Sequence, residues 1–163
     1  MLLPHLMNAV EGRASDLVDE LLCDVAVNPR TRHLHTISRD DLRRAILDLY
    51  TNLSRWLTEK DEREIEHAYA RRGREAAVRG VPLSELAYAL VLAKRHLWDF
   101  IRRNGIADTA MEILTEEEVA LLIGEFFDKA IYHSVRGYEV DWLRQPHHDP
   151  SSTTSGGGVK VAE

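Results

Sequence analysis

The fold is decided by the stretch Gly80-Val-Pro-Leu-Ser-Glu-Leu-Ala-Tyr-Ala-Leu-Val-Leu-Ala-Lys-Arg-His-Leu-Trp-Asp-Phe-Ile101. Gly80 is typical of the residue after a helix end, and Pro82 is typical of the first turn of a new helix. Apolar residues then recur every three or four positions, which is the period of one helix face. They are Leu83, Leu86, Ala87, Leu90, Ala93, Leu97, Phe100 and Ile101. The stretch therefore predicts a corner between two helices, and Asn104-Gly105 is expected to end the second.

The same helical spacing predicts further helices on both sides of this corner. They cover about residues 2–26, 38–58, 61–80 and 115–142. Ser38 stands three positions before Asp41, and Thr115 stands three before Glu118. Ser38 and Thr115 are therefore expected to cap the helices that follow them. No segment shows the alternation of a strand, so the sequence predicts an all-α fold with a long last helix.

Three local signals refine this arrangement. Gly12 lowers the helix propensity in the middle of the first helix and indicates a bend there. Residues 28–37 contain proline, threonine and histidine without a helical period, so we expect a loop. Asp108 is expected to cap a short turn that ends at Met111.

Composition favours one globular domain followed by a tail. The chain has 163 residues, of which 44% are apolar and 29% are charged, so it is long enough to bury a core. We expect the helical domain to cover residues 1–144. Residues 145–163 are rich in Ser, Gly and Pro, which is typical of a flexible tail or linker.

Charge and cysteine content restrict the expected partners and compartment. The net charge of −6 argues against a nucleic-acid binder. The longest uncharged apolar run, residues 86–93, is too short to span a bilayer, and the N-terminus lacks the pattern of a signal peptide. A single cysteine, Cys23, cannot form an internal disulfide, which favours a reducing compartment. We therefore expect a cytoplasmic protein that binds neither nucleic acid nor membrane.

The residue pattern indicates no metal site, and no cofactor is expected. His33 and His35 lack the one-turn spacing of helical zinc ligands. Two alternatives stay open. The first is a haem-binding sensor with an axial histidine on an apolar helix face, for which His96 and His133 are the candidates. The second is a small helical enzyme built around Cys23 or around acidic pairs.

Two surfaces are candidates for binding a partner. The first is a group of arginines at residues 71–79, which forms either a solvated helix face or a patch for an anion or a partner. It consists of Arg71, Arg72, Arg74 and Arg79. The second is the last helix, whose aromatic residues extend further than four neighbouring helices are expected to cover, so that a dimer seam or signalling stalk results. They include Phe126, Phe127, Tyr138 and Trp142. We expect a homodimer.

The corner and the helix before it resemble the N-terminal domain of the RsbR-type co-antagonists of the RsbT kinase. The resemblance is best over residues 60–103 and is compatible with the helix order over about residues 1–143. The matching positions are Gly73, Arg79, Gly80, Pro82, Leu83, Leu86, Arg95, Leu97 and Trp98.

This resemblance implies a globin-like bundle of five to six helices that binds no haem and dimerises. It brings no catalytic residues, so the implied function is non-enzymatic signal input in a bacterial stress-response system of the stressosome type. The implied partner is a signalling protein: a kinase, a phosphatase or a STAS-domain protein. RsbR-like proteins continue into a STAS domain, whereas this chain ends after a short tail. It is therefore either an excerpt of a longer regulator or a free-standing module that acts by binding.

Overall fold

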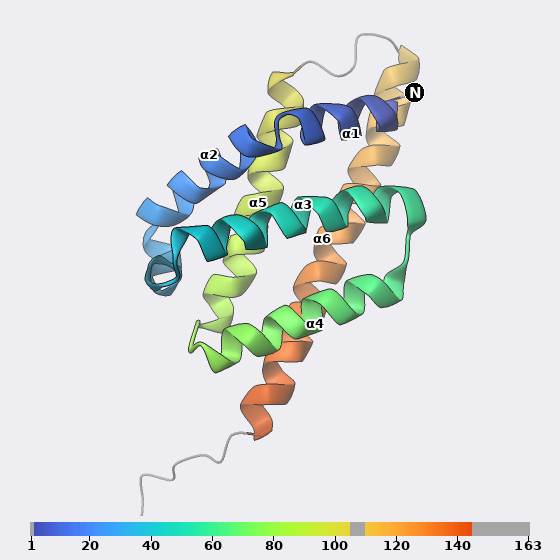
Figure 1. The fold of residues 1–163 in the computed structure, drawn as a ribbon. Coiled ribbons are helices and arrows are strands. Elements are labelled where there is room, and N and C mark those ends of the chain that lie inside the picture. Colours follow the sequence, from blue (N-terminus) through green and yellow to red (C-terminus); the bar gives the residue numbers. More distant parts are fainter. Residues whose placement is uncertain (1, 105–109, 145–163) are drawn as a thin grey trace, which may run out of the picture.

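The computed structural model describes residues 2–104 and 110–144, which form helices and no strand (Figure 1). Six α-helices and one 3-10 helix follow one another in this part of the chain. They are α1 (Leu2–Gly12), α2 (Ala14–Val27), η1 (Pro29–Thr36), α3 (Arg39–Glu59), α4 (Glu62–Val78), α5 (Leu83–Arg103) and α6 (Ala110–Arg144). The predicted all-α architecture with a long last helix is confirmed. The predicted tail, residues 145–163, lies outside the described residues.

The corner at Gly80 forms as the sequence predicts. Gly80 has a φ of +70°, a left-handed conformation that glycine adopts without steric cost. The N–H of Gly80 donates to the carbonyl of Ala77 at 3.1 Å. The N–H of Val81 donates to the carbonyl of Ala76 at 3.0 Å, which completes the hydrogen-bond pair of a Schellman helix end. Because the side chains of Val81 and Ala76 are both buried, packing also fixes the turn before Pro82 and α5.

The predicted starts of α3 and α4 are also confirmed. The hydroxyl of Ser38 accepts a hydrogen bond from the N–H of Asp41 at 3.1 Å, which satisfies one of the free donors at the start of α3. The carboxylate of Asp61 accepts from the N–H groups of Arg63 at 2.9 Å and Glu64 at 3.3 Å at the start of α4. Both starts therefore follow from local hydrogen bonding that the sequence already shows.

The first part of the chain differs from the prediction in two places. The helix predicted over residues 2–26 is interrupted at Arg13, whose φ of −123° and ψ of 18° are not helical, so the bend indicated by Gly12 separates α1 from α2. Residues 29–36 form η1 where we expected a loop. The Asn28 side chain caps η1 by accepting from the N–H of Arg30 at 3.0 Å. The prediction was wrong here because a 3-10 helix is short and lacks the 3.6-residue period.

The start of α6 was also predicted incorrectly. The helix begins at Ala110, so Thr115 lies inside it and does not mark its first turn. A Ser/Thr and Glu pair marks a start only where the preceding residues leave the helix, and residues 110–114 (Ala-Met-Glu-Ile-Leu) are mostly strong helix formers. The predicted cap at Asp108 lies outside the described residues.

The helices form two crossed layers, in which α1 to α4 lie across α5 and α6 (Figure 1). The closest helix pair is α4 with α6, and the C-terminal end of α6 extends beyond α4. The core contains apolar side chains with no solvent exposure. They include Val18, Leu92, Leu97, Ile123, Phe126, Phe127 and Ala130. The two layers are therefore held by burial of one apolar face of each helix.

Candidate functional site

A cavity of about 160 Å³ lies between α3, α4 and α5, beside the corner at Gly80. The last turns of α2 and the following η1 also contribute to its wall. Most of the wall is apolar, because the helices present their core-facing side chains to it. Typical wall residues are Ile46 and Leu49 of α3, Ala76 of α4, and Leu86, Ala89 and Leu90 of α5.

Four charged side chains complete the lining of this cavity: Asp41, Arg72, Glu75 and Arg79. Glu75 and Arg79 are exposed, so the cavity reaches the protein surface on the α4 side. Three of the four side chains have an ion-pair partner of opposite charge. The pairs are Asp41 with Arg44 (2.5 Å), Arg72 with Asp48 (2.8 Å) and Glu75 with Arg71 (3.7 Å).

Arg79 differs from the other charged residues of the lining. Its backbone N–H donates to the carbonyl of Glu75, but its guanidinium forms no ion pair or hydrogen bond with any residue that the structure describes. The cavity opening therefore presents one cation whose charge no described side chain neutralises.

Tyr69 is a polar residue in the otherwise apolar part of the wall. Its side chain is almost completely buried, and among the described residues no hydrogen bond reaches its hydroxyl. Burial raises the pKa of Tyr69 well above its usual value, because the phenolate would be poorly solvated there. Asn52 lies near the Tyr69 hydroxyl and partly offsets the rise in its pKa. The two side chains nevertheless form no hydrogen bond of normal geometry.

The four arginines predicted as one patch do not share a single environment. Arg72 and Arg79 line the cavity, whereas Arg71 and Arg74 do not. Arg71 pairs with Glu75 one helical turn away, as the interpretation of a solvated face expects. The structure therefore divides the predicted patch between a cavity rim and an ordinary helix surface.

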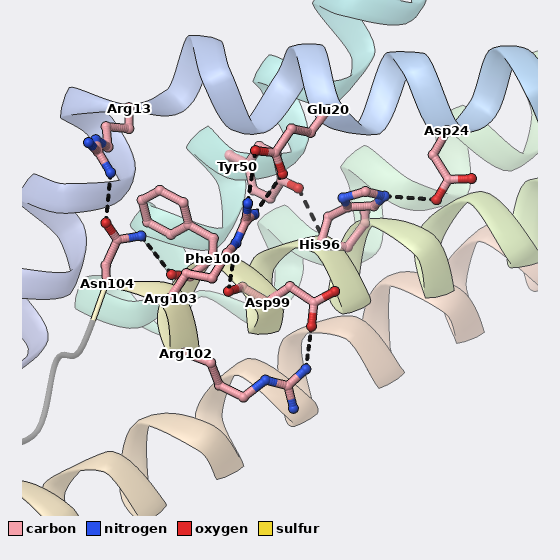
Figure 2. A network of polar contacts seen from close by, with 11 residues as sticks. Arg13, Glu20, Asp24, Tyr50, His96, Asp99, Phe100, Arg102, Arg103 and Asn104 are labelled. Carbon is pink, nitrogen blue, oxygen red and sulfur yellow. Dashed lines mark hydrogen bonds and ion pairs between the residues drawn. The ribbon is translucent and has the colours of Figure 1, made fainter.

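His96 lies at the contact between α5 and α2 and does not line the cavity. Its Nε2 atom is 2.8 Å from a carboxylate oxygen of Asp24, and this hydrogen bond is the main reason why the pKa of Asp24 is lowered. Figure 2 shows the pair in a row of polar contacts between the two helices, together with Arg103 to Glu20 at 2.7 Å. The ring nitrogen that a haem iron would need is therefore engaged by Asp24.

The other two candidates for chemistry do not line the cavity, and His133 is half-buried. His133 is on α6, where its ring lies edge-to-face against Tyr132 with 5.2 Å between ring centroids. Cys23 is exposed on α2, and no hydrogen bond connects it to another residue within the described part of the chain. Over residues 2–104 and 110–144, no group of three or more His, Cys, Asp or Glu side chains could hold a metal ion.

The aromatic residues predicted for a dimer seam on α6 divide into two groups. Phe126 and Phe127 are fully buried in the monomer and lie edge-to-face with 5.2 Å between their ring centroids. They are therefore core residues, and their assignment to a seam was wrong, because the helices of the same chain already cover them. Tyr138 is half-buried, and Trp142 is exposed.

Glu85 is a structural residue of the corner whose role the sequence did not indicate. It is buried, although it is charged, and it connects α5 to η1. One carboxylate oxygen accepts from the backbone N–H of His33 at 2.8 Å, and the other lies 2.8 Å from the Nδ1 atom of its ring. Burial raises the pKa of Glu85, but these hydrogen bonds outweigh it, so the net shift is downward. In the sequence, Glu85 appears only as an acid in the first turn of a helix. The favourable interaction of such an acid with the helix dipole already explains its presence there.

The part of the chain that the structure describes is thus an all-α domain with a mostly apolar cavity that opens on the α4 side and with a long last helix. A family model described as the RsbT co-antagonist protein rsbRD N-terminal domain matches residues 11–141, and the chain belongs to this family. The family consists of signal-input domains of the stressosome type, so the predicted place in signal transduction and stress response is confirmed. No curated protein and no solved structure matches the chain. None of the helices over the described residues has the length and apolar character needed to cross a membrane.

Proposed function

We propose that this chain is a cytoplasmic signal-input module that forms a homodimer through the outer face of α6 and acts by binding, without catalysis. Family membership supports the regulatory role. The dimer rests on one observation, a row of exposed large apolar side chains along α6. They are Leu121, Tyr132 and Leu143, with 75%, 58% and 71% of their surface exposed.

The spacing of these side chains places them on one face of the helix. Leu121, Tyr132 and Leu143 are each 11 residues apart. Eleven residues make about three turns of an α-helix, so neighbouring members of the row differ by about 20° in direction and the first and last by about 40°. The positions between them on the same face, 125, 128, 136 and 139, hold charged residues, so a partner would contact the three apolar side chains at separate points about three turns apart. A second copy of the same helix is the partner that such a row fits best, because it offers an equal row.

The length of α6 suits transmission of a signal. With 35 residues, α6 is about 52 Å long, and its C-terminal end extends beyond α4 (Figure 1). In this proposal, binding at the domain shifts this helix relative to its partner copy, as helices shift at other subunit interfaces. The proposed recipient is a signalling protein, namely a kinase, a phosphatase or a STAS-domain protein.

The dimer is tested by sedimentation equilibrium of the unchanged chain and of two variants. The combined change Leu121→Glu and Tyr132→Glu introduces charges into the row and is expected to give a monomer. The matched change Val78→Glu alters an exposed valine of α4 outside the row and is expected to leave the dimer intact. A monomeric unchanged chain, or a double variant that still dimerises, would contradict the proposed interface.

The regulatory partner is tested by calorimetric titration with an RsbT-type kinase from the same genome. Saturable binding is expected, since the family is described by its relation to RsbT. Absence of binding by this kinase, together with absence of binding by phosphatases and STAS proteins encoded next to the chain, would contradict the proposed partner class.

A further inference from the structure

We propose that the cavity between α3, α4 and α5 binds a small apolar molecule that carries one carboxylate group. The apolar part lies among the helices, and the carboxylate lies at the opening beside Arg79. The inference that this ligand is the input signal of the module rests on the proposed function. The inference that it binds rests on the cavity alone.

The size of the cavity limits the apolar part of the ligand. Its volume of about 160 Å³ is close to that of an apolar protein cavity of about 150 Å³ that binds benzene. An apolar group of about five or six carbons therefore fits. The wall suits such a group, since Ile46, Leu86 and Leu90 are typical of its lining.

The charges at the opening favour an anion. The two acids of the lining, Asp41 and Glu75, already pair with Arg44 and Arg71. Arg72 pairs with Asp48. Of the four charged side chains in the lining, the one left without a partner among the described residues is therefore Arg79. A carboxylate is the common anionic group that a guanidinium binds with two parallel hydrogen bonds.

The test compares hexanoate with 1-hexanol, which has the same chain length but no charge, by titration calorimetry. Hexanoate is expected to bind about tenfold more tightly, because a hydrogen bond to a charged partner is the stronger one. Arg79→Gln is expected to remove this advantage and to leave the affinity for 1-hexanol unchanged. Arg74→Gln, which removes a charge from the same helix outside the cavity lining, is the matched control and should alter neither affinity.

A second variant tests whether binding takes place in the cavity. Ala89→Leu adds three carbons to the wall and is expected to abolish binding of both compounds, with circular dichroism confirming that the protein is folded. If Ala89→Leu does not fold, Ala45→Val in the α3 part of the wall is used in its place. The proposal is overturned if neither compound binds, if binding survives in the folded wall variant, or if hexanoate has no advantage over 1-hexanol. Sedimentation of the same samples reports the dimer independently, so failure of one proposal is distinguishable from failure of the other.

Discussion

A Cβ atom on Gly73 of α4 would lie 2.0 Å from the carbonyl oxygen of Ser134 in α6. The converse contact has the same character, because a Cβ atom on Gly137 of α6 would lie 2.0 Å from the carbonyl oxygen of Ala70. Neither distance leaves room for a carbon atom, so the two backbones touch at this crossing. Two glycines from distant parts of the chain thus make α4 and α6 the closest helix pair of the fold.

Gly73→Ala is therefore expected to destabilise the protein by about 2 kcal/mol, because the new methyl group must separate two backbones that cannot yield locally. Gly137→Ala should act in the same direction from the other side of the crossing. Chemical denaturation followed by circular dichroism measures the free energy of unfolding of each variant. A Gly73→Ala protein as stable as the unchanged chain would mean that the helices do not touch here.

Gly124→Ala provides the matched control within α6. A Cβ atom at this position meets no atom within 4 Å, so the methyl group has space. Alanine is favoured over glycine inside a helix by about 0.5–1 kcal/mol. The same chemical change is therefore expected to stabilise the protein at Gly124 and to destabilise it at Gly73.

Phe126→Ala tests the assignment of this ring to the core of the monomer. The ring is fully buried and lies edge-to-face against Tyr69, with 5.8 Å between the ring centroids. Its removal leaves a large cavity and is expected to cost about 3–5 kcal/mol in the free energy of unfolding. Val27→Ala, at an exposed site on α2, is the control and should change it by less than about 0.5 kcal/mol. If Phe126 lay in a dimer interface instead, diluting the unchanged chain until it is monomeric would lower its free energy of unfolding by much of the same amount.

The sequence predicted the parts of this fold that depend on local chemistry. The starts at Ser38 and Asp61 and the stop at Gly80 are set by hydrogen bonds to residues a few positions away, so each appears in the sequence as a short pattern. The period of apolar residues likewise follows from the geometry of a single helix.

The candidate site could not be predicted in the same way, because it depends on contacts between distant residues. Within α4 alone, Gly73 is a residue of low helix propensity. Only the close approach of the α4 backbone to Ser134 of α6 explains why a glycine stands at this position. His33 and Glu85 are 52 positions apart, so neither suggests the other. The sequence did identify Arg72 and Arg79, but not that their side chains line a cavity formed by three helices.

Glu85→Ala is expected to destabilise the protein by about 2 kcal/mol at neutral pH. The change leaves the backbone N–H of His33 without its charged acceptor, and hydrogen bonds to charged groups are worth about 1.5–3 kcal/mol. Glu75→Ala, which alters an exposed acid of α4, is the control and should have little effect.

The contribution of Glu85 is expected to depend on pH in one direction. Its pKa in the folded protein is lowered, so its stabilising effect is fully present above the pKa of the unfolded chain, which is about 4.5, and is lost as the pH falls through the folded pKa. The difference in unfolding free energy between the unchanged chain and Glu85→Gln should therefore be larger at pH 7 than at pH 3. An equal difference at both values would show that the carboxylate charge does not contribute.

Arg103→Gln is expected to have a small effect that salt removes. The guanidinium contacts both carboxylate oxygens of Glu20, at 3.2 and 2.7 Å, and the pKa of Glu20 is lowered mainly by this hydrogen bond (Figure 2). The side chains are 56% and 42% exposed, so water and ions compete for the same charges. At 1 M salt the screening length falls to about 3 Å, and the thermal midpoints of the variant and the unchanged chain should then coincide.

The penalty of Glu85→Ala should persist at the same salt concentration, because that carboxylate is shielded from solvent and bound to a backbone N–H. A salt-independent loss on Arg103→Gln would instead show that its aliphatic stem contributes through packing against α2.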